Sequence, residues 1–341
     1  MKSRAEIDFV IMWVNGNDPI WKEKKQRYLP NAQQDDREIR YRDWGLLRYW
    51  FRAVEQCAPW VRRIYFISDG QKPAWLNEEH PQLRITDHRD FIPLNYLPTF
   101  SANPIELNLH RLPELAEQFV FFNDDMFLLQ PVRPEDFFVH GLPVDDAVLS
   151  PIMLTKKQDI GNIVANDMAV INTFFDKRNV IKQAPGKWMN PRYGQKLLRT
   201  LCLMPWRHFA GFYNDHLPQP FLKQTFCEIW YQEADLLEEV CTHRFRDYQR
   251  DVNQWLMRYW QFGKNCFIPG SPYRGKDLNV LSEETVPHIL KRKTRMICIN
   301  DSDEISDFAK VRENVEHAFQ QIFPERSRFE KEEKRETGGH V

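Results

Sequence analysis

Paired acidic side chains follow an apolar segment that should form a buried strand. Asp124 and Asp125 come after residues 119–122, with Asn123 between them and the strand. Carboxylate oxygens are preferred ligands of hard divalent cations, and such a cation can bridge the phosphates of a nucleotide-sugar. A turn with a helix N-cap would use the same residue types. A second acidic cluster, which contains Asp301, also follows an apolar segment, and a helix cap is again an alternative.

A histidine lies between two aromatic-rich segments, in a loop that proline stiffens. His216 stands shortly before Pro218 and Pro220, which restrict the backbone on its carboxyl side. An imidazole with a near-neutral pKa could remove the proton of an acceptor hydroxyl. A structural role for a single loop histidine is the alternative.

Several cations could offset phosphate charge. Arg40 and Arg42 flank Tyr41, and Arg246 and Lys223 lie in the second half of the chain. An arginine can bind a phosphate through a bidentate fork. Each of these residues taken alone could equally be an ordinary surface cation.

Three common catalytic motifs do not occur in the sequence. It contains no complete Gly-x-x-x-x-Gly-Lys-Ser/Thr phosphate loop, because Asp277 follows the match at 270–276, and it has no Gly-x-Gly-x-x-Gly fingerprint and no Gly-x-Ser-x-Gly elbow. This argues against P-loop kinases, dinucleotide-dependent enzymes and serine hydrolases.

The elements that must position these residues alternate between strand and helix patterns. Apolar runs predict strands at 7–14, 63–68, 83–86 and 119–122, and helical spacing predicts helices over 43–57 and 105–117, with a short one at 73–76. The alternation predicts an α/β fold with a mostly parallel, Rossmann-like sheet. Ligands bind outside the carboxyl ends of such strands, and polar residues cluster there in this sequence.

The rest of the chain predicts an additional helical layer. Residues 156–289 contain several aromatic-rich helical patterns and should form a helical subdomain that completes the active site. A last strand at 295–299 and a helix over 304–323 should return to the α/β core formed by residues 1–155 and 290–323. Residues 324–341 are highly charged, which predicts a solvated, flexible tail.

Composition excludes some classes of partner. The chain has 341 residues, with 47 basic and 48 acidic side chains, so no net charge attracts it to nucleic acid. The six cysteines lack the spacing of a zinc site and indicate reduced thiols in a cytoplasmic protein. No apolar run approaches the roughly 18 residues of a membrane helix, so any membrane association should be peripheral.

Four blocks of the sequence resemble the Stealth family. This family includes bacterial capsular polysaccharide phosphotransferases and the catalytic part of the animal lysosomal-enzyme N-acetylglucosamine-1-phosphotransferase. The blocks agree in order and spacing and are IDFVIMWVNGNDPIW at 7–21, the segment 36–125 that runs from DREIRY through LPTFSANPIE to FNDD, NDHLPQPFLK at 214–223, and CIND at 298–301.

The resemblance implies a nucleotide-sugar donor, a divalent metal such as Mg²⁺ or Mn²⁺, and a saccharide or polysaccharide acceptor. An acceptor hydroxyl would attack the phosphorus bonded to the sugar, release a nucleoside monophosphate and form a phosphodiester of a capsular or exopolysaccharide. The enzyme would then act in the cytoplasm, at most peripherally associated with a polysaccharide-synthesis complex at the inner membrane face.

The resemblance also assigns roles to residues. The expected metal ligands are Asp124, Asp125 and Asp301, of which Asp124 is also catalytic. His216 is the expected base, and Arg246 the group that stabilises developing phosphate charge. The expected donor-binding residues are Asn15, Arg40, Ser101, Glu106 and Lys223.

Two other functions are compatible with the sequence. A metal-dependent glycosyltransferase would use a similar sheet and similar carboxylates, but it would release a nucleoside diphosphate. A carbohydrate-binding protein could stack sugars on some of the 11 tryptophans. Trp44 and Trp50, however, have the spacing of core residues on a predicted helix.

Overall fold

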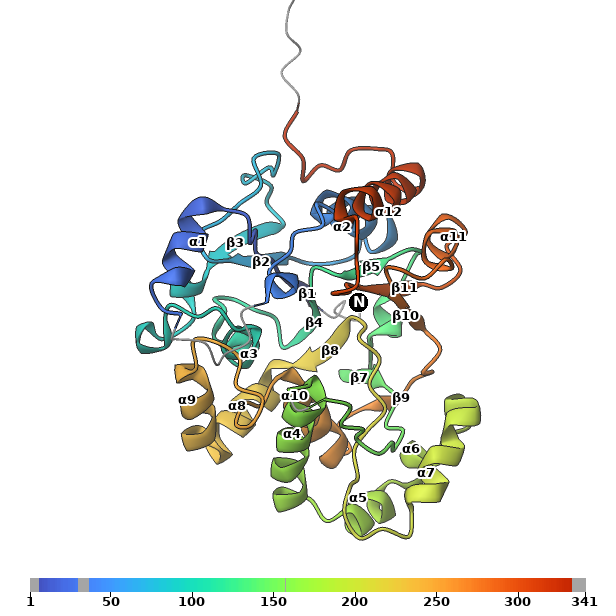
Figure 1. Ribbon diagram of the computed structural model, residues 1–341. Coiled ribbons are helices and arrows are strands. Elements are labelled where there is room, and N and C mark those ends of the chain that lie inside the picture. The colour runs from blue at the N-terminus through green and yellow to red at the C-terminus, as the bar shows by residue number, and fades with distance from the viewer. Residues whose placement is uncertain (1–5, 30–36, 157, 333–341) are drawn as a thin grey trace, which may run out of the picture.

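The computed structural model describes residues 6–29, 37–156 and 158–332 (Figure 1). Its main sheet has five strands in the order β3-β2-β1-β4-β8. The strands are β1 (Ile7–Met12), β2 (Ile64–Ser68), β3 (Leu83–Asp87), β4 (Gln118–Phe122) and β8 (Gln219–Leu222). The first four are parallel, and β8 pairs antiparallel with β4. The predicted α/β fold with a mostly parallel sheet is thereby confirmed.

Two small sheets flank the main one. One has the order β10-β11-β5 and consists of β10 (Gly275–Asn279), β11 (Met296–Asn300) and β5 (Met126–Leu128). The other joins β6 (Phe138–Val139), β7 (Leu142–Asp145) and β9 (Ile268–Pro269). The predicted last strand is therefore present as β11, but it pairs with β10 and β5. This pairing brings the end of β11 close to the acidic residues between β4 and β5.

Helices cover both faces of the main sheet (Figure 1). Successive side chains of a strand point to opposite faces, so Phe9 packs in one apolar cluster and Val10 in the other. The first cluster includes residues of α2 (Leu47–Cys57) and α12 (Phe308–Ile322), and the second includes residues of α4, α8, α9 and α10. Burial on both faces explains why the parallel strands are almost continuously apolar.

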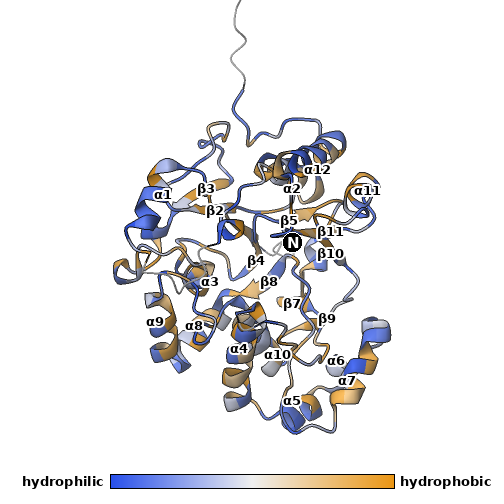
Figure 2. Cartoon of the chain, viewed as in Figure 1, coloured by the Kyte–Doolittle hydropathy of each residue, from blue (hydrophilic) through white to orange (hydrophobic). Residues whose placement is uncertain are grey.

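Ten further α-helices are present in the described part of the chain, and most of them carry both hydrophobic and hydrophilic residues, as α12 does (Figure 2). They are α1 (Pro19–Gln26), α3 (Ala102–Leu107), α4 (Ile160–Phe174), α5 (Lys177–Gln183), α6 (Pro185–Trp188), α7 (Leu197–Leu203), α8 (Lys223–Gln232), α9 (Ala234–Thr242), α10 (Gln254–Gly263) and α11 (Thr285–Leu290). Within the described residues, none of the helices is long and apolar enough to cross a membrane.

Two predicted helices differ from the structure. The helix expected over 105–117 is the short α3 followed by a single 3₁₀ turn, Leu109–Arg111. It begins earlier because Ser101 caps it, and Pro113, which has no N–H to donate, follows the 3₁₀ turn. Residues 73–76 form a turn, and no helix is assigned there.

Part of the segment expected to be a solvated tail is packed against the core. Phe329 is buried, and the Glu330 carboxylate receives hydrogen bonds of 2.7 and 2.8 Å from Nε and Nη2 of Arg52 on α2. The prediction of a flexible tail is wrong for residues 327–331, because one aromatic side chain and one buried ion pair anchor a mostly charged sequence whose other charged residues are exposed. The remaining tail residues, 333–341, lie outside the described part.

Candidate active site

A cavity of about 570 Å³ lies at the carboxyl ends of the parallel strands. Its lining includes Met12 at the end of β1, Asp69 just after β2, and residues 123–125 after β4. The size falls within the roughly 300–1,000 Å³ typical of small-molecule sites. The cavity therefore lies where the predicted fold should bind a ligand.

The antiparallel direction of β8 explains which of its flanking residues reach the cavity. Residues that precede β8 lie at the carboxyl end of β4, and residues that follow it lie at the amino end. His216 precedes β8 and lines the cavity. Lys223 follows β8, and its backbone N–H donates a hydrogen bond to Glu117 O, just before β4 begins. The structure therefore places Lys223 at the amino ends of the parallel strands, away from the cavity that the other expected donor-binding residues line or adjoin.

Asp124 and Asp125 both line the cavity, with Asp43 nearby. Burial raises the pKa of the Asp124 carboxyl well above its usual range, and the negative charges of Asp125 and Asp43 add to the effect. Oδ1 of Asp125 is buried and receives no hydrogen bond from the described residues. Among the described residues, neither carboxylate forms an ion pair with a lysine or arginine, and such an acidic pair fits a hard divalent cation.

Asp301 also lines the cavity, but its carboxylate is already engaged. Arg42 Nη1 donates to Oδ1 and Oδ2 at 3.1 and 3.2 Å, and Trp44 Nε1 donates to Oδ2 at 3.1 Å. The Ser302 N–H donates to Oδ1. These contacts make Asp301 a weaker candidate for a metal ligand than the pair Asp124 and Asp125.

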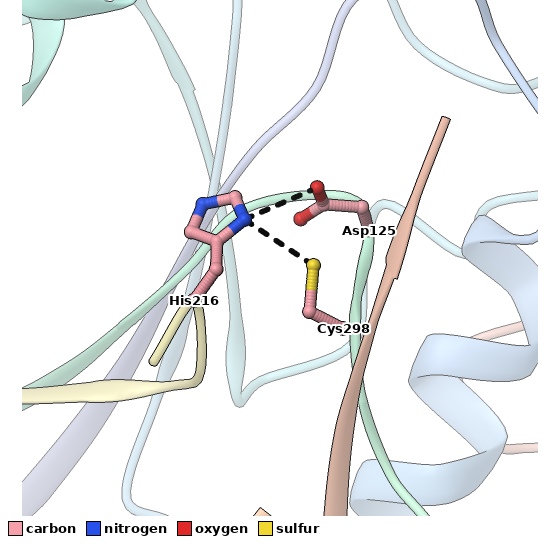
Figure 3. Close-up of side chains that lie close together, drawn as sticks. All are labelled: Asp125, His216 and Cys298. Atoms are coloured by element: carbon pink, nitrogen blue, oxygen red, sulfur yellow. Dashed lines mark hydrogen bonds and ion pairs between the residues drawn. The ribbon is translucent and has the colours of Figure 1, made fainter. Parts of the chain in front are cut away.

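His216 contacts three side chains from two segments of the chain, and Figure 3 draws two of them, Asp125 and Cys298. Its Nε2 lies 2.9 Å from Asn123 Nδ2, and its Nδ1 lies 3.2 Å from Cys298 Sγ and 3.6 Å from Asp125 Oδ2. With the Asn123 amide in this orientation, Nδ2 donates, so Nε2 carries the lone pair and Nδ1 the hydrogen. The nearby Asp125 carboxylate would stabilise the imidazolium that forms when Nε2 takes a proton.

Asp277 on β10 is a site residue that the sequence did not reveal. Its Oδ2 accepts a hydrogen bond of 3.3 Å from the backbone N–H of His216, and burial raises its pKa. The loop that carries His216 packs closely against Gly275, the first residue of β10. A Cβ atom added at Gly275 would lie 2.6 and 2.8 Å from the two methyl carbons of Leu217. The polar sequence of β10 has no strand pattern, so β10 was hidden in the predicted helical subdomain.

Two arginines contribute positive charge to the cavity. Arg40 and Arg246 both line it. Nη2 of Arg40 donates to the Tyr248 hydroxyl at 2.8 Å, and the Arg246 guanidinium lies 5.9 Å from the centre of the Tyr248 ring. The two expected phosphate-binding arginines thus come from distant segments of the chain and meet at one tyrosine.

Ser101 and Glu106 are buried residues at the two ends of α3, and both line the cavity. Burial raises the pKa of Glu106, whose Oε2 accepts a 3.1 Å hydrogen bond from the Gln254 N–H.

Asn15 is not among the lining residues, although its neighbour Val14 is. Asn15 Oδ1 accepts from the Asn17 N–H, and the Asn15 backbone forms two hydrogen bonds with the Gln71 amide. Asn15 therefore shapes the loop after β1.

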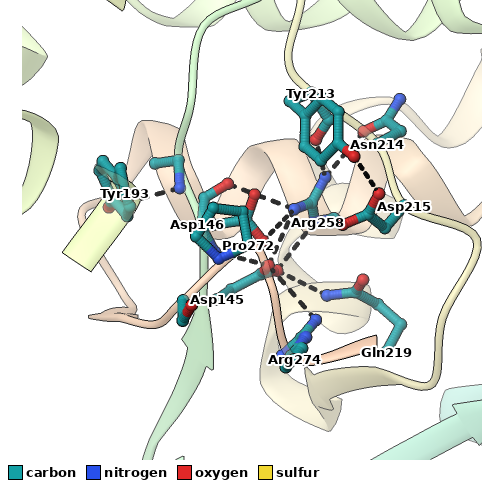
Figure 4. Close-up of polar contacts among 12 residues, drawn as sticks. Asp145, Asp146, Tyr193, Tyr213, Asn214, Asp215, Gln219, Arg258, Pro272 and Arg274 are labelled. Carbon is teal, nitrogen blue, oxygen red and sulfur yellow. Dashed lines mark hydrogen bonds and ion pairs between the residues drawn. The ribbon is translucent and has the colours of Figure 1, made fainter. Parts of the chain in front are cut away.

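A buried arginine of α10 fixes the loop that carries His216. Nη1 of Arg258 donates to Tyr213 O at 2.9 Å and to Asn214 Oδ1 at 2.7 Å (Figure 4). Asn214 Nδ2 donates in turn to the hydroxyl of Tyr259. The Tyr213 backbone and the Asn214 side chain, three and two residues before His216, are thus attached to α10.

Three family models match separate parts of this chain. The family models Stealth protein CR1, conserved region 1, CR2, conserved region 2, and CR4, conserved region 4, match residues 5–33, 40–144 and 287–338. The chain is 41% identical over 336 residues to the capsular polysaccharide phosphotransferase WcwK of Streptococcus pneumoniae, covering 97% of this chain and 100% of the relative.

Relatives from other bacteria cover similar lengths. The receptor polysaccharide phosphotransferase WefC of Streptococcus oralis is 39% identical, with 95% of this chain and 99% of the relative covered. The exopolysaccharide phosphotransferase cps2G of Lactiplantibacillus plantarum is 38% identical, with 96% of each chain covered. With three family regions and full-length relatives matched, this chain belongs to the Stealth family and is a phosphotransferase.

Proposed function

We propose that this enzyme transfers a hexose-1-phosphate, such as N-acetylglucosamine-1-phosphate, from a nucleotide-sugar to a saccharide hydroxyl. The product would be a phosphodiester in a capsular or exopolysaccharide. The supporting observation is that one cavity holds an acidic pair, an oriented histidine and two arginines. The names of the relatives, which are polysaccharide phosphotransferases, support the same reaction class.

Asp124 and Asp125 are the residues that would hold Mg²⁺ or Mn²⁺. Their carboxylates supply oxygen ligands, and their mutual repulsion in a buried position favours a cation between them. When bound, the ion would neutralise charge on the donor diphosphate. Arg42 and Trp44 already bind Asp301, which would instead fix the wall of the cavity.

His216 is the proposed general base. When the acceptor hydroxyl displaces the Asn123 amide from Nε2, the Nε2 lone pair would take the hydroxyl proton while that oxygen bonds to the phosphorus next to the sugar. The bond from this phosphorus to the bridging oxygen then breaks, and a nucleoside monophosphate leaves. Asp125, 3.6 Å from Nδ1, would stabilise the imidazolium. Arg40 and Arg246 would stabilise the charge on the transferred phosphate.

The identity of the released nucleotide tests this proposal. Purified enzyme would be incubated with UDP-N-acetylglucosamine and other nucleotide-sugars, short capsule-like oligosaccharides, and Mg²⁺ or Mn²⁺. Metal-dependent release of UMP or another monophosphate, together with a phosphodiester in the sugar product, is the expected result. Release of UDP would instead identify a glycosyltransferase. Sugar binding without turnover that survives Asp124→Asn would identify a binding protein.

A further inference from the structure

A thiol, an imidazole and a carboxylate meet beside the cavity, which Asp125 and His216 line and behind which Cys298 is buried. They come from three distant segments: Asp125 follows β4, His216 precedes β8, and Cys298 lies on β11 (Figure 3). One potential ligand atom from each lies within 4.8 Å of the other two. The arrangement includes Cys298 Sγ, which the proposed transfer reaction does not use.

Two of the three spacings between these atoms are close to those of a tetrahedral transition-metal site, and the third is within 4.8 Å. Zinc bonds to sulfur at about 2.3 Å and to nitrogen or oxygen at about 2.0–2.2 Å, so neighbouring ligand atoms lie roughly 3.3–3.6 Å apart at tetrahedral angles. His216 Nδ1 lies 3.2 Å from Cys298 Sγ and 3.6 Å from Asp125 Oδ2. Small adjustments of the side chains would complete the site.

The ligand types select the metal. Magnesium and calcium prefer oxygen ligands, whereas a thiolate and an imidazole favour zinc or a similar thiophilic ion. The imidazole is about one-third exposed at the cavity, so an ion has access from solvent, and water could supply a fourth ligand. This site therefore differs in chemistry from the carboxylate pair of the proposed magnesium site, although the two share Asp125.

We propose that Asp125, His216 and Cys298 bind zinc and that zinc bound there inhibits the enzyme. The inhibitory effect rests on the proposed role of His216 as base, whereas the metal site itself does not. A zinc ion on Nδ1 requires that nitrogen to carry the lone pair, so the imidazole hydrogen moves to Nε2. The thiol proton is released to solvent as the thiolate binds the metal. Nε2 then can no longer accept the proton of the acceptor hydroxyl.

Cobalt binding tests the site without any substrate. Co²⁺ accepts the ligands of zinc, and a bound thiolate produces charge-transfer absorption in the near ultraviolet. The full chain with Cys202→Ser and Cys227→Ser serves as the starting protein, because these two thiols are exposed and could bind metal on their own. We expect one cobalt per chain with charge-transfer absorption, and displacement by one zinc.

Two variants and one control identify the ligands. Cys298→Ser should abolish the charge-transfer absorption and weaken zinc binding about 100-fold or more. His216→Ala, at a partly exposed position, should weaken zinc binding similarly, and circular dichroism should verify that both variants fold. Cys57→Ser removes a buried thiol on α2 and should leave the cobalt spectrum unchanged. A charge-transfer band that persists in Cys298→Ser, or is absent from the starting protein, would overturn the metal site.

Inhibition is then measured in excess Mg²⁺, as the decrease in the rate at which the enzyme releases its nucleotide product, whether a monophosphate or a diphosphate. Zinc should inhibit the starting protein at the concentration that fills the site defined by cobalt binding. In Cys298→Ser, the same fractional loss of turnover should require about 100-fold more zinc. Zinc that fills the site without slowing turnover would refute the inhibitory role. Because cobalt binding needs no donor or acceptor, failure of the proposed transfer reaction would be distinguished from failure of the metal site.

Discussion

Arg258 and Asp145 form a buried bidentate ion pair beneath the loop that carries His216. Nε and Nη2 of Arg258 each donate to one oxygen of Asp145, both at 2.8 Å (Figure 4). Asp145 Oδ2 also accepts a 2.6 Å hydrogen bond from Nε2 of Gln219, three residues after His216. Since Arg258 itself binds the backbone before His216, the pair secures the loop on both sides of the proposed base.

Arg258→Lys should lower both stability and turnover. Lysine cannot reproduce the planar fork that binds the carboxylate and the loop together, and breaking a buried pair costs about 3–5 kcal/mol. We expect a loss of that order in denaturant unfolding, and a larger fall in kcat than in donor affinity. Arg250→Lys is the control, because Arg250 pairs with Asp247 at the surface and should tolerate the change. Wild-type turnover in Arg258→Lys would show that this pair does not position His216.

Asp124→Asn and Asp125→Asn should each weaken binding of Mn²⁺, which electron paramagnetic resonance can measure directly. Loss of a ligand should reduce affinity at least about 10- to 100-fold. Asp301→Asn should leave Mn²⁺ affinity nearly unchanged, because this carboxylate binds Arg42 and Trp44. Asp303→Asn changes an exposed carboxylate and is the control. An equal effect of Asp301→Asn would restore Asp301 as a metal ligand.

His216→Gln should separate chemistry from donor binding. Removal of a general base lowers turnover by roughly 10²- to 10⁴-fold, whereas calorimetry should show little change in nucleotide-sugar affinity. The exposed His208, which does not line the cavity, provides the control His208→Gln. Substantial turnover in His216→Gln would require a different base.

Gly275→Ala should disturb the position of His216 without changing any polar group. The added Cβ would lie 2.8 Å from Met296 O and would also meet the Leu217 side chain. Overpacking of this kind costs about 1–3 kcal/mol. We expect reduced thermal stability together with reduced kcat. Gly186→Ala, where a Cβ meets no atom within 4 Å, should leave both unchanged.

The ion pair between Arg52 and Glu330 should make stability depend on pH. Burial opposes ionisation of Glu330, but hydrogen bonds from Arg52 and Ser327 and the Arg52 charge outweigh it, so the folded-state pKa lies below 4.5. The stabilisation is therefore fully present above pH 4.5 and is lost as pH falls through the folded-state pKa.

Glu330→Gln should accordingly be less stable than the wild type at pH 7, by about 3 kcal/mol. The difference should shrink as the pH falls below 4.5, since protonation then removes the pair from the wild type as well. Denaturant unfolding at pH 7 and in the acid range measures both values. A difference that does not vary with pH would mean that Glu330 acts through packing alone.

Local sequence determined the parallel strands and most of what surrounds their ends. The apolar runs that became β1, β2 and β4 must be buried on both faces, and the polar residues that stop each run collect at one edge of the sheet because parallel strands share a direction. For this reason Asp124 and Asp125 could be placed at the cavity, whereas His216, Arg40 and Arg246 are assigned to the same site through the resemblance to the Stealth family.

Tertiary structure decided what depends on strand direction and on long-range pairing. The antiparallel direction of β8 places His216 at the cavity, near the carboxyl end of β4, and Lys223 near the amino end of β4, although both belong to one short segment. Asp277 reaches His216 because β10 pairs with β11, and Arg42 reaches Asp301 across 259 positions of the sequence. Phe329 and Glu330 anchor residues that composition alone assigns to solvent. Local sequence fixes which side chains are available, whereas the burial of distant partners fixes which of them meet.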